Sequence, residues 1–449
     1  MEKRNRRFFH LMAGSIILLL AFQAVSIQAL PSAQFAGPAD YGIGQGPYYV
    51  AVADLNHDGN LDLISANYLD GSLSVLLGNG DRTFTAATNY PVSGGIFPGP
   101  QMVIAGDFNN HHQQDLVTSS LGTSTVEYFA GNGDGTFATP LDFNIDSGAY
   151  GLASGDFNGD GRLDVVAAAF GANELSILIG DSNQVFVAGT SLPTGDGPQA
   201  VAVADFDGDG KLDIVDANYY DNTVSVFLGN GDGTFGTRTD YDVGSRPEYV
   251  TTGDLNGDGN IDLIAVNSED ASVTVLLGQG DGTFSPGIIY PVGAYPNWVA
   301  VADLNGDGIP DLVVANAGNF SLSLLIGVGD GIFLPQVQIP LETLGYPFAV
   351  TAGDFNNDGR MDLVVASYWL NAASVLLNTS LPVLSLTQTN TLATLDWPAV
   401  PGFQLESTTN ILSDNDWNWV TNEPTTNANR MRVSLPIIQP GEFFRLQQN

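Results

Sequence analysis

The stretch DLNGDGNIDLIAVN, residues 254–267, places three carboxylates within nine residues and follows them directly with an apolar run. Like charges about 4 Å apart repel by roughly 4 kcal/mol at an effective dielectric constant near 20, so such a loop is costly without a counter-charge. The apolar residues that follow are typical of a buried strand. The stretch therefore predicts a cation-binding turn that leads into a β-strand.

This stretch is one of seven related copies, and the copies follow one another at intervals of 53, 49, 49, 49, 49 and 51 residues. A period of about 50 residues is typical of propellers and solenoids. Each unit contains four short apolar runs bounded by Gly and Asn turns, which indicates four strands. The copies begin at Asp54, Asp107, Asp156, Asp205, Asp254, Asp303 and Asp354.

The two ends of the repeat region favour a closed ring over an open array. The seventh unit stops at SVLLNTS, residues 374–380, and lacks a fourth strand of its own, whereas residues 35–44 match the end of a unit. Blades arranged around an axis leave only short, protected sheet edges. We therefore predict an all-β chain with a seven-bladed β-propeller over residues 30–380, closed by its N-terminal strand.

Both ends of the chain depart from the repeat. Residues 1–29 carry EKRNRR directly after Met1 and continue with an apolar run and small residues, the order of a secretory signal peptide. A retained membrane anchor is the alternative, although the run is short for a span. Residues 381–449 predict about six strands without acidic loops, which we interpret as a small antiparallel β-sandwich. Its expected apolar residues are Leu384, Leu386, Leu395, Trp397, Trp417, Trp419, Phe443 and Phe444.

The composition restricts the possible partners. The chain has 49 acidic and 13 basic side chains, a net charge of −36 and no cysteine. Nucleic acid and anionic membranes need basic patches, so both are excluded as expected partners. An exported chain without disulfides must take its rigidity from its core or from metal ions. We expect a secreted monomer, extracellular or at the cell surface, with the periplasm also open, and without a membrane span once the signal peptide is removed.

The acidic loops follow the pattern D-x-[DN]-x-D-G-x-x-D, and its oxygen ligands suit calcium. Side chains at places one, three, five and nine would supply oxygens, and place seven would supply its backbone carbonyl. Magnesium is less suitable because it demands a strict octahedron and keeps several waters. The six complete sets are Asp54, Asn56, Asp58, Asn60 and Asp62; Asp156, Asn158, Asp160, Arg162 and Asp164; Asp205, Asp207, Asp209, Lys211 and Asp213; Asp254, Asn256, Asp258, Asn260 and Asp262; Asp303, Asn305, Asp307, Ile309 and Asp311; Asp354, Asn356, Asp358, Arg360 and Asp362.

The second loop, DFNNHHQQD, is a doubtful seventh site. It keeps Asp107, Asn109 and Asp115 but has His111 at the fifth place and no glycine at the sixth. For every loop, an Asx-type turn that needs no ion is the alternative. We therefore predict about six calcium ions.

The repeated loop resembles the FG-GAP and VCBS repeats, a family that includes the propeller of integrin alpha subunits. The phenylalanine-glycine half of the motif occurs as FGTRTDY from Phe235, and more loosely as DGTF at 134–137, 232–235 and 281–284. The resemblance covers roughly residues 35–380. It implies a seven-bladed propeller with calcium in the loop between the first and second strand of each blade. The chain departs from integrin alpha subunits in its lack of cysteine and in its six complete loops, so integrin-like pairing is not implied.

The turns on the face opposite the acidic loops are rich in aromatic residues, which together with Asn and Asp suit a sugar or a protein loop. The alternative is that these rings pack between blades near the axis. Their concentration in units one, four, six and seven suggests that one side of the face binds. The candidates are Tyr48, Tyr49, Tyr68, Tyr219, Tyr220, Tyr295, Trp298, Tyr346, Tyr368 and Trp369.

Motifs for catalysis are scarce in the sequence. His57 lies at a variable loop place, and the neighbours His111 and His112 leave open a shared transition-metal site. No nucleophile elbow, zinc spacing or phosphate loop is present. We therefore expect a recognition or adhesion module for a glycan or protein ligand and not an enzyme. A secreted polysaccharide-active enzyme and a purely structural cell-surface component are the alternatives.

Overall fold

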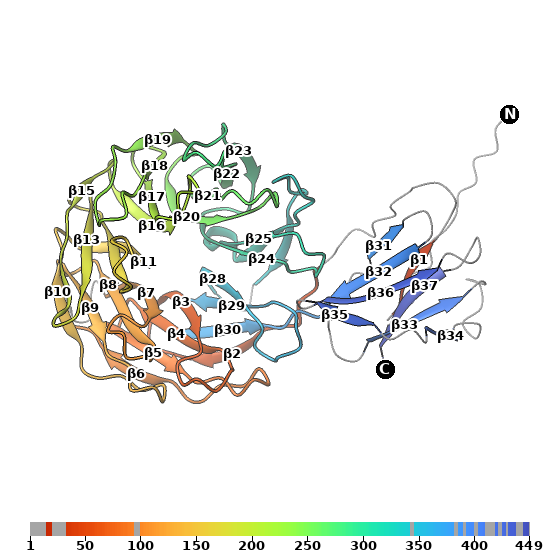
Figure 1. Ribbon diagram of the computed structural model, residues 1–449. Helices are drawn as coiled ribbons and strands as arrows, with labels where there is room; N and C mark the ends of the chain where they lie inside the picture. The colour runs from red at the N-terminus through yellow and green to blue at the C-terminus, as the bar shows by residue number, and fades with distance from the viewer. Residues whose placement is uncertain are drawn as a thin grey trace.

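The computed structural model describes residues 15–19, 33–93, 99–341 and 345–380, and within the C-terminal region residues 385–388, 392–398, 403–408, 418–420, 424–427, 430–436 and 443–448. Among these residues, the strands of the repeat region form seven antiparallel sheets placed around a central axis (Figure 1). A single turn of 3-10 helix, η1 (Ala317–Asn319), is the one helical element among them. The prediction of an all-β, seven-bladed propeller is confirmed.

Each blade is an antiparallel sheet whose first strand lies nearest the axis, and blade three carries one additional short strand, β15. The strands, blade by blade, are β3 (Pro47–Ala53), β4 (Asp62–Asn67), β5 (Ser72–Leu76) and β6 (Thr88–Pro91); β7 (Pro100–Gly106), β8 (Asp115–Ser120), β9 (Thr125–Phe129) and β10 (Leu141–Asn144); β11 (Ala149–Gly155), β12 (Asp164–Ala169), β13 (Glu174–Asp181), β14 (Val185–Ala188) and β15 (Leu192–Pro193); β16 (Pro198–Ala204), β17 (Asp213–Asn218), β18 (Thr223–Phe227) and β19 (Thr239–Asp242); β20 (Pro247–Gly253), β21 (Asp262–Asn267), β22 (Ser272–Leu276) and β23 (Ile288–Pro291); β24 (Pro296–Ala302), β25 (Asp311–Asn316), β26 (Ser321–Leu325) and β27 (Val337–Pro340); β28 (Pro347–Gly353), β29 (Asp362–Ser367), β30 (Ala372–Leu376) and β2 (Ala39–Gly42).

The N-terminal strand closes the ring. β2 pairs antiparallel with β30, with Ala39 opposite Val375 and Gly42 opposite Ala372. Ser374 Oγ donates to Asp40 Oδ1 over 2.7 Å, which links the two strands through their side chains. The predicted fourth strand of blade seven is therefore confirmed.

The core lies between neighbouring blades. Every residue of the second strand of each blade is buried, as in β21 and β25, because these strands are covered on both faces by the adjacent sheets. The acidic loops belong to the same interfaces. Gly282 N in blade five donates to Phe206 O in the acidic loop of blade four over 3.1 Å, and the rings of Phe206 and Phe284 lie 5.5 Å apart. The loops thus form part of the contacts that hold one blade against the next.

The first strand of every blade is bulged near its beginning. In each of the seven pairings with the second strand, the register shifts directly after the first residue, as between Pro47 and Tyr49. A β-bulge places two residues opposite one and redirects their side chains. The residues of the bulge are therefore brought to the central axis at the end of the propeller remote from the acidic loops.

The C-terminal region contains two four-stranded sheets among its described residues. One has the order β31 (Ser385–Gln388), β32 (Leu392–Pro398), β36 (Arg430–Pro436), β35 (Thr425–Asn427), and the other β1 (Ser15–Leu19), β37 (Phe443–Gln448), β33 (Phe403–Thr408), β34 (Asn418–Trp419). The predicted core residues Leu395 and Trp397 are buried. Leu384 and Trp417 lie outside the described residues, as do the side chains of Leu386, Trp419, Phe443 and Phe444. The packing of the two sheets as a sandwich stays a prediction.

Most of the predicted signal peptide, residues 1–29, lies outside the described residues. The described part is β1, which pairs antiparallel with β37. Within the described part of the chain, we find no helix of the length and apolarity that crossing a membrane requires. The signal peptide stays a prediction, and its removal would leave β37 as an edge strand.

Candidate functional site

The propeller has two chemically different faces. Each acidic loop joins the end of a first strand to the start of a second, for example from Ala53 to Asp62, so all seven loops share one face. The turns that precede the first strands and those between second and third strands lie at the opposite ends of the same strands. We refer to the two as the loop face and the aromatic face.

The loop of blade five shows how the acidic pattern folds. Asp254 accepts the backbone N–H groups of Gly257 and Gly259 over 2.7 and 3.0 Å. Asp262 is fully buried, and its two carboxylate oxygens accept Leu255 N and Gly278 N, each over 2.8 Å. The ninth place therefore fastens the loop to the strands, and every carboxylate oxygen so used keeps a further lone pair. These hydrogen bonds form an Asx-type turn, which is the arrangement expected under the alternative to metal binding.

The carboxylates of each loop influence one another electrostatically. Burial, together with the nearby charges of Asp307 and Asp303, raises the pKa of Asp311 to about 7, against the lowering by two backbone hydrogen bonds. The same causes raise the pKa of Asp62, Asp164 and Asp213 to about 6 and that of Asp362 to about 7. A divalent cation would reverse this effect because it favours the charged form.

One loop brings its acids close enough to share an ion. Carboxylate oxygens of Asp205, Asp207 and Asp209 all lie within 4.8 Å of one another. Among the described residues, this is the one group of three or more acidic, His or Cys side chains that meets in this way. The donors are all oxygens, which fits calcium better than a transition metal.

The loops differ in their internal charge. Lys211 Nζ lies 2.6 Å from Asp209 Oδ2, and Arg360 pairs with Asp358 at the equivalent place. The fifth-place carboxylates of these two loops therefore already have a counter-ion. By contrast, the seventh place holds Asn60, Asn260 or Ile309 in the loops of blades one, five and six. We therefore expect the six predicted sites to differ in affinity.

The second loop folds without the missing acid. His111 N and His112 N donate to the two oxygens of Asp107 over 2.9 and 2.8 Å, which reproduces the turn of the complete loops. The His112 Nδ1 lies 3.9 Å from Asp107 Oδ2, and its side chain is exposed. His57 is also exposed, with a left-handed φ of 59°. Among the described residues, no metal group that includes His111 and His112 is formed.

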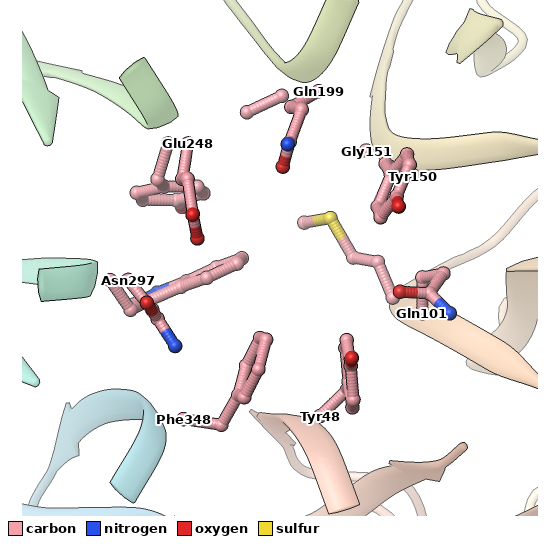
Figure 2. Close-up of a pocket in the computed structure, with 12 residues that line it drawn as sticks. Tyr48, Gln101, Tyr150, Gly151, Gln199, Glu248, Asn297 and Phe348 are labelled. Atoms are coloured by element: carbon pink, nitrogen blue, oxygen red, sulfur yellow. The ribbon is translucent and has the colours of Figure 1, made fainter. Parts of the chain in front are cut away.

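On the aromatic face, the bulged first strands surround an axial cavity of about 50 Å³. One residue from each blade contributes to a ring around it, and Figure 2 shows these side chains around the axis. Tyr249 and Trp298, which directly follow two of these ring residues in the chain, stack with ring centroids 3.6 Å apart. The ring consists of Tyr48, Gln101, Tyr150, Gln199, Glu248, Asn297 and Phe348.

A second pocket of about 190 Å³ adjoins the axial cavity and is wholly aromatic. Tyr48 and Phe348 line both, and their rings stack with centroids 3.9 Å apart. Tyr346, Tyr368 and Trp369 complete the pocket. The aromatic face therefore offers a continuous surface from the axis outward over blade seven.

The predicted ligand-face residues fall into two groups. Tyr49 and Trp298 lie near the axis and contact each other, with ring centroids 4.7 Å apart. These two residues therefore agree with the alternative that the rings pack between blades. Tyr220, Tyr295 and Trp369 are 55%, 62% and 61% exposed, so they are free to contact a ligand. The remaining candidates, Tyr48, Tyr68, Tyr219, Tyr346 and Tyr368, are half-buried.

Of the seven ring residues, sequence reasoning singled out only Tyr48. Tyr150, Glu248 and Tyr249 line the axial cavity, so aromatic groups are not confined to the four units that the sequence suggested. A signal was present, because each ring residue stands six places before the first Asp of its acidic loop, directly after Pro in six units and Ala149 in one. The ring position is occupied by Tyr, Gln, Glu, Asn or Phe, so residue type alone did not reveal it.

Asp216 is a buried acid with a raised pKa, a property that catalytic acids often share, but it lies inside a blade and away from both pockets. It is fully buried within β17, and Thr194 Oγ1 donates to its carboxylate over 2.9 Å. Burial raises its pKa to about 8, against the lowering by Thr194 and by the charge of Arg238. It does not line either of the two pockets.

We expect Asp216→Asn to stabilise the protein by about 2 to 4 kcal/mol at pH 8. The folded carboxyl keeps its proton up to a pKa of about 8, whereas the unfolded one loses it near pH 4, so the folded state binds more protons between these values. The stability of the natural chain therefore falls as pH rises through this window. Urea unfolding at fixed calcium should show the advantage of the variant widening from pH 5 to pH 8. Asp242→Asn, at an exposed acid on β19 of the same blade, is the matched control, and an equal effect there would contradict the assignment.

Comparison with known proteins gives a family and a fold. A family model described as an FG-GAP-like repeat matches residues 54–118, 107–167, 156–215, 217–265, 254–314 and 303–365. No curated protein matches the chain. Among solved structures, BBS1N, crystallised in complex with ARL6DN, aligns with a TM-score of 0.54 at 13% identity, over 77% of this chain and 97% of its own. An Agrocybe aegerita lectin that recognises non-reducing terminal N-acetylglucosamine aligns with a TM-score of 0.49 at 18% identity, over 80% of this chain and 100% of its own. At these identities the likeness concerns the fold alone.

Proposed function

The chain belongs to the FG-GAP-like repeat family, and from this premise we propose that it is an exported, calcium-stabilised module that recognises a glycan or protein ligand on its aromatic face. The observation that carries the proposal is the axial cavity, to which all seven blades contribute a ring side chain on the face opposite the acidic loops. Concave sites with aromatic walls and a few polar groups are the usual form of ligand sites.

Calcium would have a structural role on the loop face. The side chains at places one, three, five and nine and the carbonyl at place seven are the proposed ligands, as for Asp303, Asn305, Asp307, Ile309 and Asp311. The bound ion would offset the burial and the charges of the neighbouring carboxylates, which together raise the pKa of the ninth-place Asp. Because the loops also contact the neighbouring blade, neutralisation would stabilise the ring as a whole.

Recognition is favoured over catalysis by the content of the axial cavity. Among the described residues that line it, Glu248 is the one carboxylate. Hydrolysis of a glycosidic bond generally uses two carboxyl groups on either side of that bond. The surrounding aromatic and amide side chains instead suit binding, and the BBS1N propeller, whose structure was solved with the protein ARL6DN, shows that this fold is compatible with a protein partner.

A binding screen tests the proposal. The purified protein is applied to a glycan array and to a panel of surface proteins, first with calcium and then with chelator. We expect a ligand that binds in calcium and is lost on chelation, and whose binding is weakened by Trp369→Ala or Tyr220→Ala. Ile289→Ala, which removes a side chain of similar exposure (60%) on the outer strand β23, should leave binding unchanged. Binding that ignores Trp369 and Tyr220, or no ligand on either panel, would count against recognition by this face.

A further inference from the structure

The axial cavity contains a buried acceptor without a donor. Gln101 is 5% exposed, and its Nε2 donates to Gly99 O over 3.3 Å. Its Oε1 is fully buried and has no hydrogen-bond partner among the described residues. Figure 2 shows this oxygen directed toward the centre of the cavity. Because an unsatisfied buried acceptor costs free energy, the position indicates an N–H or O–H donor from outside the chain.

The same cavity contains Glu248, a carboxylate for which no ion pair is found among the described residues. Glu248 extends into the cavity from the other side of the ring (Figure 2). Burial raises its pKa to about 7, against the lowering by a hydrogen bond with Ser268 and by the charge of Arg246. Arg246 itself pairs with Glu269 over 3.3 Å and stacks on Tyr219. Among the described residues, no basic side chain forms an ion pair with Glu248, so the cavity favours an incoming cation.

The walls of the cavity also suit a cation. Tyr249 and Trp298 form a stacked pair, and Tyr48 and Phe348 form another. The faces of aromatic rings attract ammonium and guanidinium groups. A volume of about 50 Å³ holds about four water-sized groups, at 10 to 15 Å³ for each. A compact head group fits this space.

We propose that the axial cavity binds a primary alkylammonium group, with Glu248 as its counter-ion and Gln101 Oε1 as acceptor of one of its N–H groups. This inference rests on the proposed recognition role of the aromatic face and names the chemistry recognised there. A primary ammonium has three N–H donors for the two acceptors, directly or through one ordered water, whereas a quaternary ammonium has none. A lysine side chain of a partner and a free small amine share this chemistry.

The experiment is a titration of the full chain, in saturating calcium at pH 8, with n-butylammonium, followed by tryptophan fluorescence and calorimetry. We expect saturable binding and a change in the emission of Trp298. Glu248→Gln should weaken the affinity by about tenfold or more, and Gln101→Leu by several-fold. Asp242→Asn removes one exposed charge from β19 in the adjacent blade and should change nothing. Tetramethylammonium, which lacks N–H groups, and the neutral 1-butanol should bind at least about tenfold more weakly.

The titrations also distinguish the source of the amine and show which results overturn the inference. Binding of Nα-acetyl-lysine-N-methylamide with an affinity similar to that of n-butylammonium supports a lysine of a protein partner as the source, and binding of n-butylammonium alone supports a free amine. No saturable binding, equal binding of 1-butanol, or equal affinity in a folded Glu248→Gln variant overturns the inference, since water would then satisfy Gln101. Such a failure differs from failure of the proposed function, which is judged by the ligand screen and by its dependence on Trp369 and Tyr220.

Discussion

Chelation of calcium with EGTA should lower the Tm of the purified protein by about 10 °C. Extracellular calcium modules bind with Kd of about 10⁻⁴ to 10⁻³ M, and a tenfold excess of ligand over Kd stabilises the folded state by about 1.4 kcal/mol per site. Six such sites would contribute on the order of 8 kcal/mol, comparable with the net stability of a whole domain. Differential scanning calorimetry in calcium, in magnesium and in EGTA measures the shift.

A single-loop variant makes this test site-specific. Asp258→Asn removes the fifth-place charge from a complete loop and should abolish about one sixth of the calcium-dependent shift. His111→Asn, at the same place of the second loop, should leave the shift unchanged because that loop already lacks the acid. An unchanged Tm after exhaustive chelation would show that the Asx turns hold the loops without any ion, and the calcium proposal would be wrong.

The loops are expected to act on the whole ring because they lie at the junctions between blades. Gly233 N donates to Phe157 O of the preceding blade over 2.9 Å, and Arg82 N donates to Phe355 O over 2.8 Å across the closure. The second of these bonds joins blade one to blade seven. Loss of order in one loop therefore removes a contact from its neighbour, so melting in EGTA should remain cooperative rather than split into blades.

The architecture was predictable from the sequence because it depends on spacing. The acidic loop recurs at nearly constant intervals, and a unit with four strands follows from its apolar runs. The closure was predictable for the same reason, since residues 35–44 supply what the seventh unit lacks. Both features follow from the spacing of residues along the sequence, so they can be predicted without three-dimensional information.

The content of the axial cavity was not predictable in the same way. A regular strand sends successive side chains to opposite faces, so reasoning from alternation places only one of Glu248 and Tyr249 toward the axis. The bulge after Pro247 brings both to the cavity. The unsatisfied Gln101 Oε1 depends on the positions of every neighbouring group, which no local pattern records. The anchoring role of Asp262 was missed similarly, because its partner Gly278 lies sixteen residues further along the chain.

Deletion of residues 33–43 from the full chain should destabilise the propeller by on the order of 5 kcal/mol. The deletion removes β2, so β30 becomes an edge with unpaired backbone groups. It also removes the backbone bonds Ala36 N to Leu377 O, Ile43 N to Asn371 O and Thr379 N to Gln34 O. Urea unfolding, with residues 33–43 replaced by a Gly-Ser linker of equal length as a second variant, measures the loss. An unchanged midpoint in both would show that the ring does not depend on its N-terminal strand.

The register of β2 should matter as much as its presence, and a peptide added to the deleted chain tests this. In the native register, Tyr41 packs edge-on against Phe84 with ring centroids 4.9 Å apart, and its hydroxyl donates to Arg82 O in blade one over 2.6 Å. A synthetic peptide of residues 33–43 should therefore restore most of the lost Tm. A second peptide lacks Ala39, so its residues 33–38 are displaced by one place relative to Tyr41. A displacement of one place turns the side chains of a strand to the opposite face, and this peptide should therefore restore much less of the lost Tm. Equal rescue by both peptides would mean that any added strand suffices, whereas selective rescue would show that closure is specified by the side chains that β2 presents to both blade seven and blade one.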